Sequence, residues 1–430
     1  MKKTSRSIPF VALQGVSAGM LLFSSATVLA QSAETLSVGA ASQAQIQGAS
    51  GVPVGQVYAP RAINYNGFFI TPSITLGAGV NDNVDLVENG KRSSNFLTIS
   101  PEVTVSIPYR DQRVDIGLRA TTNLYGASGT QNTTTAELAA TGTHPLDARN
   151  GLTWRAGLQR GADAARPTAT GSTTDLWNQA VLGGVYRYGA QDALINLEGE
   201  LGYQGRRYSN NRADTRTADF NALKAAGRVF YRVGPKTRLV GEYRVTGTNY
   251  INDLTPSLDN TDHKLLAGVD WDASDALSGR ILAGYEIKNY KDSARSRYKG
   301  LTYEGGLTWK PIERTQFDLT ASRSGTDAGA GVNTGTNGTG LGLAWTHQWR
   351  PWISSIASVG YGRSDYEGTS RTDDSKTVRL GVSYDFRRWL RLGANFEHLT
   401  SSTSNATAVP TVRAANYSRN LLYFTASMGL

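Results

Sequence analysis

Apolar and polar side chains alternate along most of this chain, in runs separated by small and polar residues. The final run is the clearest: the apolar residues Leu422, Phe424, Ala426, Met428 and Leu430 occupy every second position. A period of two is typical of a β-strand with one apolar face. An apolar strand at the end of the chain is what a membrane barrel needs to close its sheet, so we expect this strand to pair with the first one.

The alternation recurs in about 18 segments, and the connections between them alternate in length. Eight are short, near residues 109–112, 145–150, 189–192, 234–236, 273–275, 311–314, 351–352 and 387–389. Nine are long and polar, near residues 81–93, 126–132, 163–174, 206–217, 251–261, 291–297, 325–338, 364–375 and 401–415. Tight periplasmic turns and long external loops are typical of outer-membrane barrels. The sequence therefore predicts an all-β, antiparallel, up-and-down transmembrane β-barrel in the outer membrane of a Gram-negative bacterium.

Aromatic residues gather at the strand ends. Trp154, Trp271, Trp309, Trp349, Trp352 and Trp389 lie at or near short turns. Tyr125, Tyr208, Tyr250, Tyr290, Tyr298, Tyr366 and Tyr417 lie beside long loops. Because aromatic girdles mark both interfaces of a membrane barrel, we expect both sets to face the lipid.

The composition excludes several other classes. Apolar residues make up 39% of the 430 residues, and no apolar run of spanning length follows the first 30 positions, which argues against membrane-spanning helices. The chain has no Cys, so it can form no disulfide or thiolate site. The net charge of +9 falls to 9 − 3 = +6 without Lys2, Lys3 and Arg6, a mild bias that predicts no nucleic-acid partner.

Residues 1–65 differ in composition from the rest of the chain. Residues 1–30 combine a basic start, an apolar middle and Val28-Leu29-Ala30, the pattern of a cleaved secretory signal peptide. Residues 31–65 are rich in Ala, Ser, Gln and Gly, which predicts a flexible periplasmic linker. The barrel is expected over residues 66–430.

The face opposite the apolar one is charged, which a hydrated lumen tolerates and a dry core does not. Its candidate pore-lining residues are Arg113, Arg119, Arg155, Arg187, Arg228, Arg238, Arg244, Arg280, Arg379 and Arg391. Eighteen strands at ~4.8 Å spacing and ~40° tilt give a barrel radius of ~18 Å, enough for a water-filled channel. The arginines either attract anions, including anionic sugars, or pair with nearby carboxylates and brace the wall.

Catalytic and cofactor sites are not indicated. The Ser, His and acidic residues show no distinctive triad arrangement, so we expect no enzyme and no cofactor. Residues 81–85, Asn-Asp-Asn-Val-Asp, are acidic enough to suggest calcium but lack the Gly and Glu of an EF-hand, so we interpret them as a solvated loop with no metal.

The stretch that begins at Phe68 resembles part of a known family. The stretch FFITPSITLGAGVNDNVDL, with its Pro-containing apolar run and Asp82-Asn83 turn, resembles the opening of a family of outer-membrane porins encoded beside exopolysaccharide genes. The resemblance implies an 18-stranded conduit that exports an exopolysaccharide, together with a periplasmic polysaccharide-export or co-polymerase partner. A general or anion-preferring diffusion porin, in which the loop at 325–338 folds inward as a constriction, is the alternative. A surface adhesin ranks last because the external loops, although longer than the turns, are short and polar for an adhesive surface.

Overall fold

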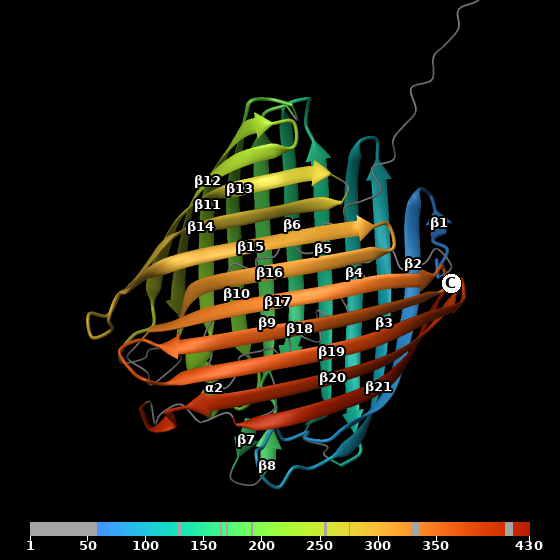
Figure 1. The fold of residues 1–430 in the computed structure, drawn as a ribbon, viewed down its shortest axis with the longest axis vertical. Helices are drawn as coiled ribbons and strands as arrows, with labels where there is room; N and C mark the ends of the chain where they lie inside the picture. Colours follow the sequence, from blue (N-terminus) through green and yellow to red (C-terminus); the bar gives the residue numbers. More distant parts are fainter. Residues whose placement is uncertain are drawn as a thin grey trace, which may run out of the picture.

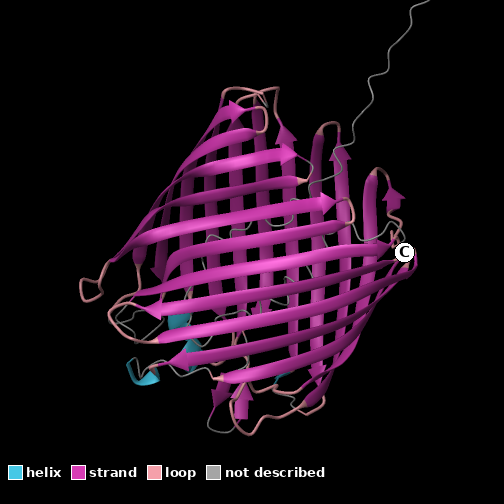
Figure 2. Cartoon of the chain, in the orientation of Figure 1, coloured by secondary structure: helices cyan, strands magenta, loops and turns pink. Residues whose placement is uncertain are grey.

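The computed structural model describes residues 58–430, apart from 128–130, 164–165, 169–170, 191, 253–255, 275, 328–334 and 409–415. The predicted signal peptide and most of the predicted linker lie outside the described residues. Strands form most of the described chain, and the short helices lie in loops at one end (Figure 2). They are α2 (Arg212–Thr215), η3 (Arg216–Ala218) and η4 (Ala406–Ala408).

Eighteen long antiparallel strands form the barrel. They are β2 (Phe68–Asn81), β3 (Ser94–Tyr109), β4 (Gln112–Tyr125), β5 (Thr133–Pro145), β6 (Asn150–Ala162), β9 (Leu176–Tyr188), β10 (Ile195–Tyr208), β11 (Phe220–Gly234), β12 (Thr237–Tyr250), β13 (Asn260–Ser274), β14 (Leu277–Tyr290), β15 (Tyr298–Ile312), β16 (Thr315–Asp327), β17 (Gly335–Arg350), β18 (Ile353–Tyr366), β19 (Thr372–Arg387), β20 (Leu390–Ser404) and β21 (Tyr417–Gly429). A small hairpin of β7 (Arg166–Thr168) and β8 (Gly171–Thr173) extends the loop after β6.

The barrel closes as predicted, because the last strand pairs with the first. Strand β21 runs antiparallel to β2, from Ser73 opposite Gly429 to Asn81 opposite Leu421. In Figure 1 the strands from β15 to β21 cross in front of β3 to β9, as tilted strands on opposite walls of a closed barrel do. The predicted class, an antiparallel transmembrane β-barrel of 18 strands, is confirmed.

The loop after β2 clasps this seam from the extracellular side. The Asp82 carboxylate accepts hydrogen bonds from the backbone N–H and the side-chain amide of Asn420, both at 2.6 Å. The Asn83 side chain, fully buried, donates to the backbone carbonyl of Ser418 at 2.9 Å. The interpretation of residues 81–85 as a solvated loop is therefore wrong for Asn83. No cluster of metal-ligating side chains occurs among the described residues.

The predicted linker ends in ordered structure. Strand β1 (Ile63–Tyr65) pairs with the start of β2 through a hairpin whose two connecting residues, Asn66 and Gly67, both have positive φ. An Asn-Gly pair is the preferred two-residue turn of a β-hairpin, because both positions need the left-handed region. Residues 31–65 thus differ from the linker prediction at their C-terminal end.

The outer face of the wall is apolar, as the alternation predicted. Leucines at outward positions are largely exposed to the surroundings of the protein, for example Leu201 and Leu301, each at 70%. Trp309, Trp349, Trp352 and Trp389 are also exposed near the short turns, in agreement with the predicted periplasmic belt. No helix among the described residues is long and apolar enough to cross a bilayer.

The expectation that the tyrosines beside the long loops face the lipid is wrong. The seven tyrosines lie on the same face of their strands as inward-facing polar residues. Tyr125 is two positions after the inward Asn123, and Tyr208 is two positions after the inward Arg206. Four of the seven, Tyr208, Tyr250, Tyr298 and Tyr366, are buried. The extracellular aromatics therefore pack inside the mouth of the barrel.

Candidate functional site

The inner wall of β10 to β15 carries a chain of ion pairs. Arg228 lies between two acids: its Nη2 is 2.5 Å from Glu200 Oε2, and its Nε is 2.8 Å from Glu242 Oε2. Arg244 continues the chain, with Nη2 at 2.6 Å from Glu242 Oε1 and 2.8 Å from Glu304 Oε1. Each buried charge thus has a partner that offsets the cost of removing it from water.

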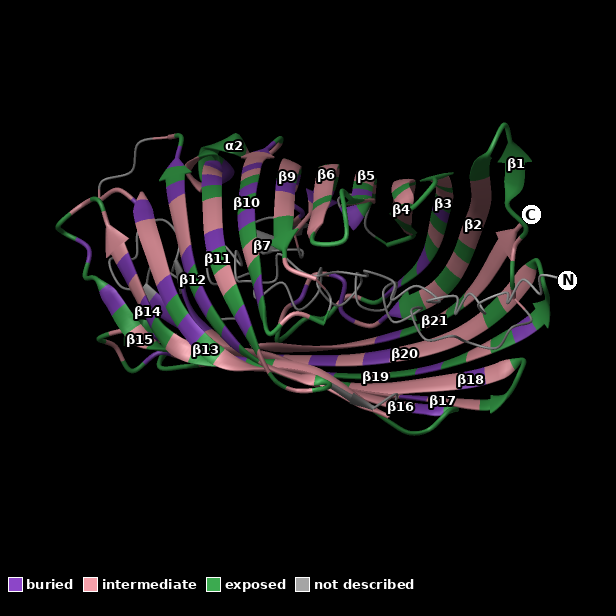
Figure 3. Ribbon diagram, turned by 90° about the horizontal axis from the view of Figure 1, so that it is seen from above, coloured by how far each residue is buried: buried purple, intermediate pink, exposed green. Residues whose placement is uncertain are grey.

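These contacts show that the wall bends sharply here. Arg244 is on β12 and Glu304 on β15, three strands apart, which is ~14 Å along a flat sheet. An arginine side chain cannot span that distance, so the inner faces must approach one another. Figure 3 shows β11 to β15 bending round one end of the molecule.

An apolar cluster fills the inside of this bend. Phe230, Val240, Leu266 and Leu282 are all buried and lie on inward positions of β11 to β14. The guanidinium groups of Arg238 and Arg280 stand 4.7 and 5.5 Å from the Phe230 ring centroid, and both contact Asp270. The bend is therefore a packed core inside the barrel.

The wall on the other side has two separate charge clusters. Glu397 accepts from Arg379 at 2.7 Å and also from Arg419. Asp385 pairs with Arg391 at 2.6 Å, and the Arg391 guanidinium stands 4.5 Å from the ring centroid of Tyr58. Tyr58, in the segment before β1, also donates its backbone N–H to Asp385, and burial raises the pKa of its phenol. The chain before the barrel is thus fixed to the periplasmic end of the lumen.

The extracellular half of the inner wall of β3 and β4 is lined by neutral polar groups. The hydroxyls of Ser100 and Thr121 are 2.8 Å apart, and Thr98 donates to Asn123 at 2.7 Å. Hydroxyl and amide groups of this kind exchange hydrogen bonds with water or with a hydroxyl-rich solute without a fixed charge.

Nine of the ten predicted pore-lining arginines form ion pairs with carboxylates. Their partners are Asp115 for Arg113, Glu102 for Arg119, Glu198 for Arg187, Glu200 and Glu242 for Arg228, Asp270 for Arg238 and Arg280, Glu242 and Glu304 for Arg244, Glu397 for Arg379, and Asp385 for Arg391. Arg155 lies opposite Thr141 and Gly183 in the neighbouring strands. The role of these residues in contact with a solute stays a prediction.

The extracellular mouth contains residues that the sequence interpretation missed. Arg371 is fully buried, donates to both oxygens of Asp373 at 3.1 and 3.0 Å, and stands 5.0 Å from the Tyr366 ring centroid. Asp163 accepts from Trp177 Nε1 at 2.9 Å and from the Tyr208 hydroxyl at 2.8 Å. Burial raises the pKa of the Asp163 carboxyl. The sequence contained one usable signal: the tyrosines near the long loops occupy inward positions of their strands, which places them inside the extracellular mouth.

These features define the class of the protein: a closed outer-membrane β-barrel of the porin kind, with a polar inner wall. The chain belongs to the family described as "Putative beta-barrel porin 2", whose model matches residues 56–428. The family description is that of a porin-like barrel. A search of curated proteins found no match.

Several solved structures are similar to this chain in fold, at low sequence identity. The copper transporter OprC is 11% identical, with a TM-score of 0.45 over 86% of this chain and 81% of that one. OccK11 (OpdR) of Pseudomonas aeruginosa is 15% identical, with a TM-score of 0.43 over 87% and 100%. OpdK of Pseudomonas aeruginosa, solved with vanillate, is 14% identical, with a TM-score of 0.46 over 84% and 98%.

Proposed function

We propose that this barrel is a conduit for the export of an exopolysaccharide across the outer membrane. The observation that supports the proposal is the pairing of nine of the ten candidate arginines with carboxylates, which leaves an inner wall that is strongly polar but locally neutral. The family resemblance described above supplies the cargo class. An anionic polysaccharide is compatible with this wall because few fixed charges would hold it.

Transport sets opposing demands on such a wall. A solute must bind favourably enough to enter and weakly enough to leave. A long polymer meets every site in the lumen at once, so a row of unpaired cations would retain an acidic polymer. Paired charges and neutral hydroxyls or amides, such as those around Ser100 and Thr121, let a hydrated chain slide.

The natural absence of cysteine allows a direct test of the lumen. Thr121 faces inward, toward Ser100, whereas Thr122 faces outward and contacts Thr134. In a deletion strain complemented with Thr121→Cys, a bulky maleimide–polyethylene glycol reagent should block the lumen and abolish surface polysaccharide. The neighbouring Thr122→Cys, labelled in the same way, is the matched control and should export normally.

The alternative of a general diffusion porin makes the opposite prediction. In that case the deletion strain keeps its surface polysaccharide, and the labelled Thr121→Cys barrel loses small-solute flux in liposomes. Intact polysaccharide in the deletion strain would refute the export proposal. The ion pairing argues against a strong anion preference, since nine of the ten candidate arginines have an adjacent carboxylate that offsets their field.

The proposal includes a periplasmic polysaccharide-export partner. The short turns and the ordered Tyr58 segment form the periplasmic end of the barrel, which is where such a partner would dock. Photo-crosslinking from Asp147, an exposed residue in the turn between β5 and β6, should capture that partner in cells that make polysaccharide. A crosslinker on the extracellular side, at Gly368, should not.

A further inference from the structure

The outer wall of the barrel has a transverse row of polar residues where the apolar band ends. Arg160 on β6 lies opposite Asn178 on β9, and Asn178 lies opposite Arg207 on β10. All three are outward positions near the extracellular ends of their strands. Strand spacing puts the two arginine backbones ~10 Å apart.

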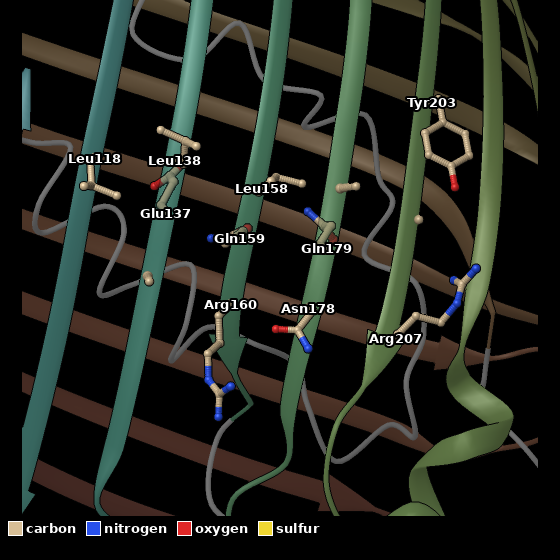
Figure 4. A pocket seen from close by; sticks show the side chains of 13 residues that line it. Leu118, Glu137, Leu138, Leu158, Gln159, Arg160, Asn178, Gln179, Tyr203 and Arg207 are labelled. Carbon is tan, nitrogen blue, oxygen red and sulfur yellow. The ribbon is translucent and has the colours of Figure 1, made fainter. Parts of the chain in front are cut away.

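An apolar hollow lies directly on the membrane side of this row. Leu118, Leu138 and Leu158 form one apolar row across β4, β5 and β6. On β9 and β10 the same row continues as Ala180 and Gly205, and the Tyr203 hydroxyl lies over Gly205. The result is a hollow of about 570 Å³, shown in Figure 4 with the three leucines on one level and Arg160, Asn178 and Arg207 on the next.

The charges of both arginines are available to a ligand. In the part of the chain that the structure describes, Arg160 makes no hydrogen bond or ion pair, and it is exposed. Arg207 is held by neutral acceptors only: the carbonyls of Arg206 and Phe220 at 2.7 and 2.6 Å, and Asn221 Oδ1 at 2.8 Å. Asp219, which precedes Phe220, is paired with Arg212 at 2.8 Å.

We propose that this hollow binds a phosphorylated glycolipid of the outer leaflet, of the lipid A type. An acyl chain would lie against Leu138, Leu158 and Ala180, and the headgroup phosphate would lie between Arg160 and Arg207. Arginine forms strong, oriented bonds to phosphate, and a basic pocket at headgroup level is the usual form of lipid-specific recognition. The Tyr203 hydroxyl lies over Gly205 and donates to Asn221 Oδ1 at 2.9 Å, the same atom that accepts from Arg207.

This site lies on the outer wall and does not depend on the transport proposal. Its test uses the full mature barrel in detergent, with lipid A titrated and bound copies counted by native mass spectrometry. Arg160→Ala combined with Arg207→Ala should weaken binding by about a hundredfold, since each charge-assisted hydrogen bond contributes about tenfold. Lys376→Ala, which removes an exposed outward cation from β19 on the other side of the barrel, should leave affinity unchanged.

Two further measurements separate headgroup from chain. Ala180→Leu fills the hollow and keeps both arginines, so it should weaken binding of lipid A but not its preference over dephosphorylated lipid A. Inorganic phosphate alone should compete only weakly. Equal affinity for the dephosphorylated lipid, an equal loss in Lys376→Ala, or displacement of lipid A by millimolar phosphate would each overturn the proposal.

Discussion

The two ends of the strands use aromatic side chains in opposite ways. At the periplasmic end, Trp309, Trp352 and Trp389 point outward and are exposed to the membrane interface. At the extracellular end, Tyr208, Tyr250 and Tyr366 point inward and are buried beneath the loops. The periplasmic turns are short enough to need no support, whereas the long outer loops need an internal anchor. Aromatic residues near a strand end therefore indicate an interface belt only when their parity is outward.

The largest expected loss of stability is at the extracellular end, where the aromatic side chains point inward. Arg371→Ala should cost about 3–5 kcal/mol, because it leaves the buried Asp373 carboxylate without its partner. Urea unfolding of the barrel in bilayers, followed by the gel shift of the folded form, measures this loss. Arg371→Ala together with Asp373→Ala should recover much of it, and a double variant no more stable than the single one would contradict the explanation.

A smaller loss is expected from the inward tyrosines. Tyr208→Phe removes a hydroxyl that donates to Asp163 and should cost about 1–3 kcal/mol. The loss should be the same in thin and thick bilayers, because this side chain does not face lipid. Limited proteolysis of the loops should also accelerate. Tyr186→Phe, on an exposed residue near the periplasmic end of β9, is the control that should leave loop cleavage unchanged.

At the periplasmic end, where the aromatic side chains point outward, the stability loss should depend on the surrounding membrane. Trp309→Ala removes a ring that stacks on Phe317 at a centroid distance of 5.2 Å, worth about 0.5–1.5 kcal/mol. It also removes an interface anchor, so the loss should grow in bilayers that match the barrel and shrink in detergent. A loss of equal size in detergent and in every bilayer would show that Trp309 acts through packing alone.

The smallest expected effect is a pH dependence of stability that is confined to the extracellular mouth. The raised pKa of Asp163 means that the folded mouth binds a proton more tightly than the unfolded chain does. Its contribution to stability is present at low pH and is lost as the pH rises from the unfolded value of about 3.9 through the raised folded value. Hydrogen-exchange protection of the loops, plotted as a function of pH, should become flatter over this pH range in Asp163→Asn. An unchanged slope would exclude Asp163.

Much of the barrel was predictable because its signals are local. The period of two and the alternation of short and long connections indicated 18 strands and the closure of the last onto the first. Several ion pairs were also within reach, because a tight turn fixes the register of its hairpin. Arg228 lies directly opposite Glu242 across the turn near Gly234, and Arg379 lies directly opposite Glu397.

The packed bend could not be predicted in the same way. Ile281 and Leu282, or Leu265 and Leu266, are adjacent apolar residues, so alternation alone does not say which one faces inward. The contact between Arg244 and Glu304 depends on the curvature of the wall, which arises from the packing of several strands together. Curvature of that kind has no signature in any single segment.

The clasp at the seam also bears on how the barrel assembles. Asp82 and Asn420 are 338 positions apart, so their meeting carries the loop-closure entropy of nearly the whole chain. Every other neighbouring pair of barrel strands is adjacent in sequence and can form early as a hairpin. Zipping of the first strand to the last is therefore the slow, late event, and Asp82 and Asn83 stabilise its outer end once the two edges arrive. Substitution of Asp82 or Asn83 should therefore produce barrels that insert into the membrane but remain unpaired between β2 and β21.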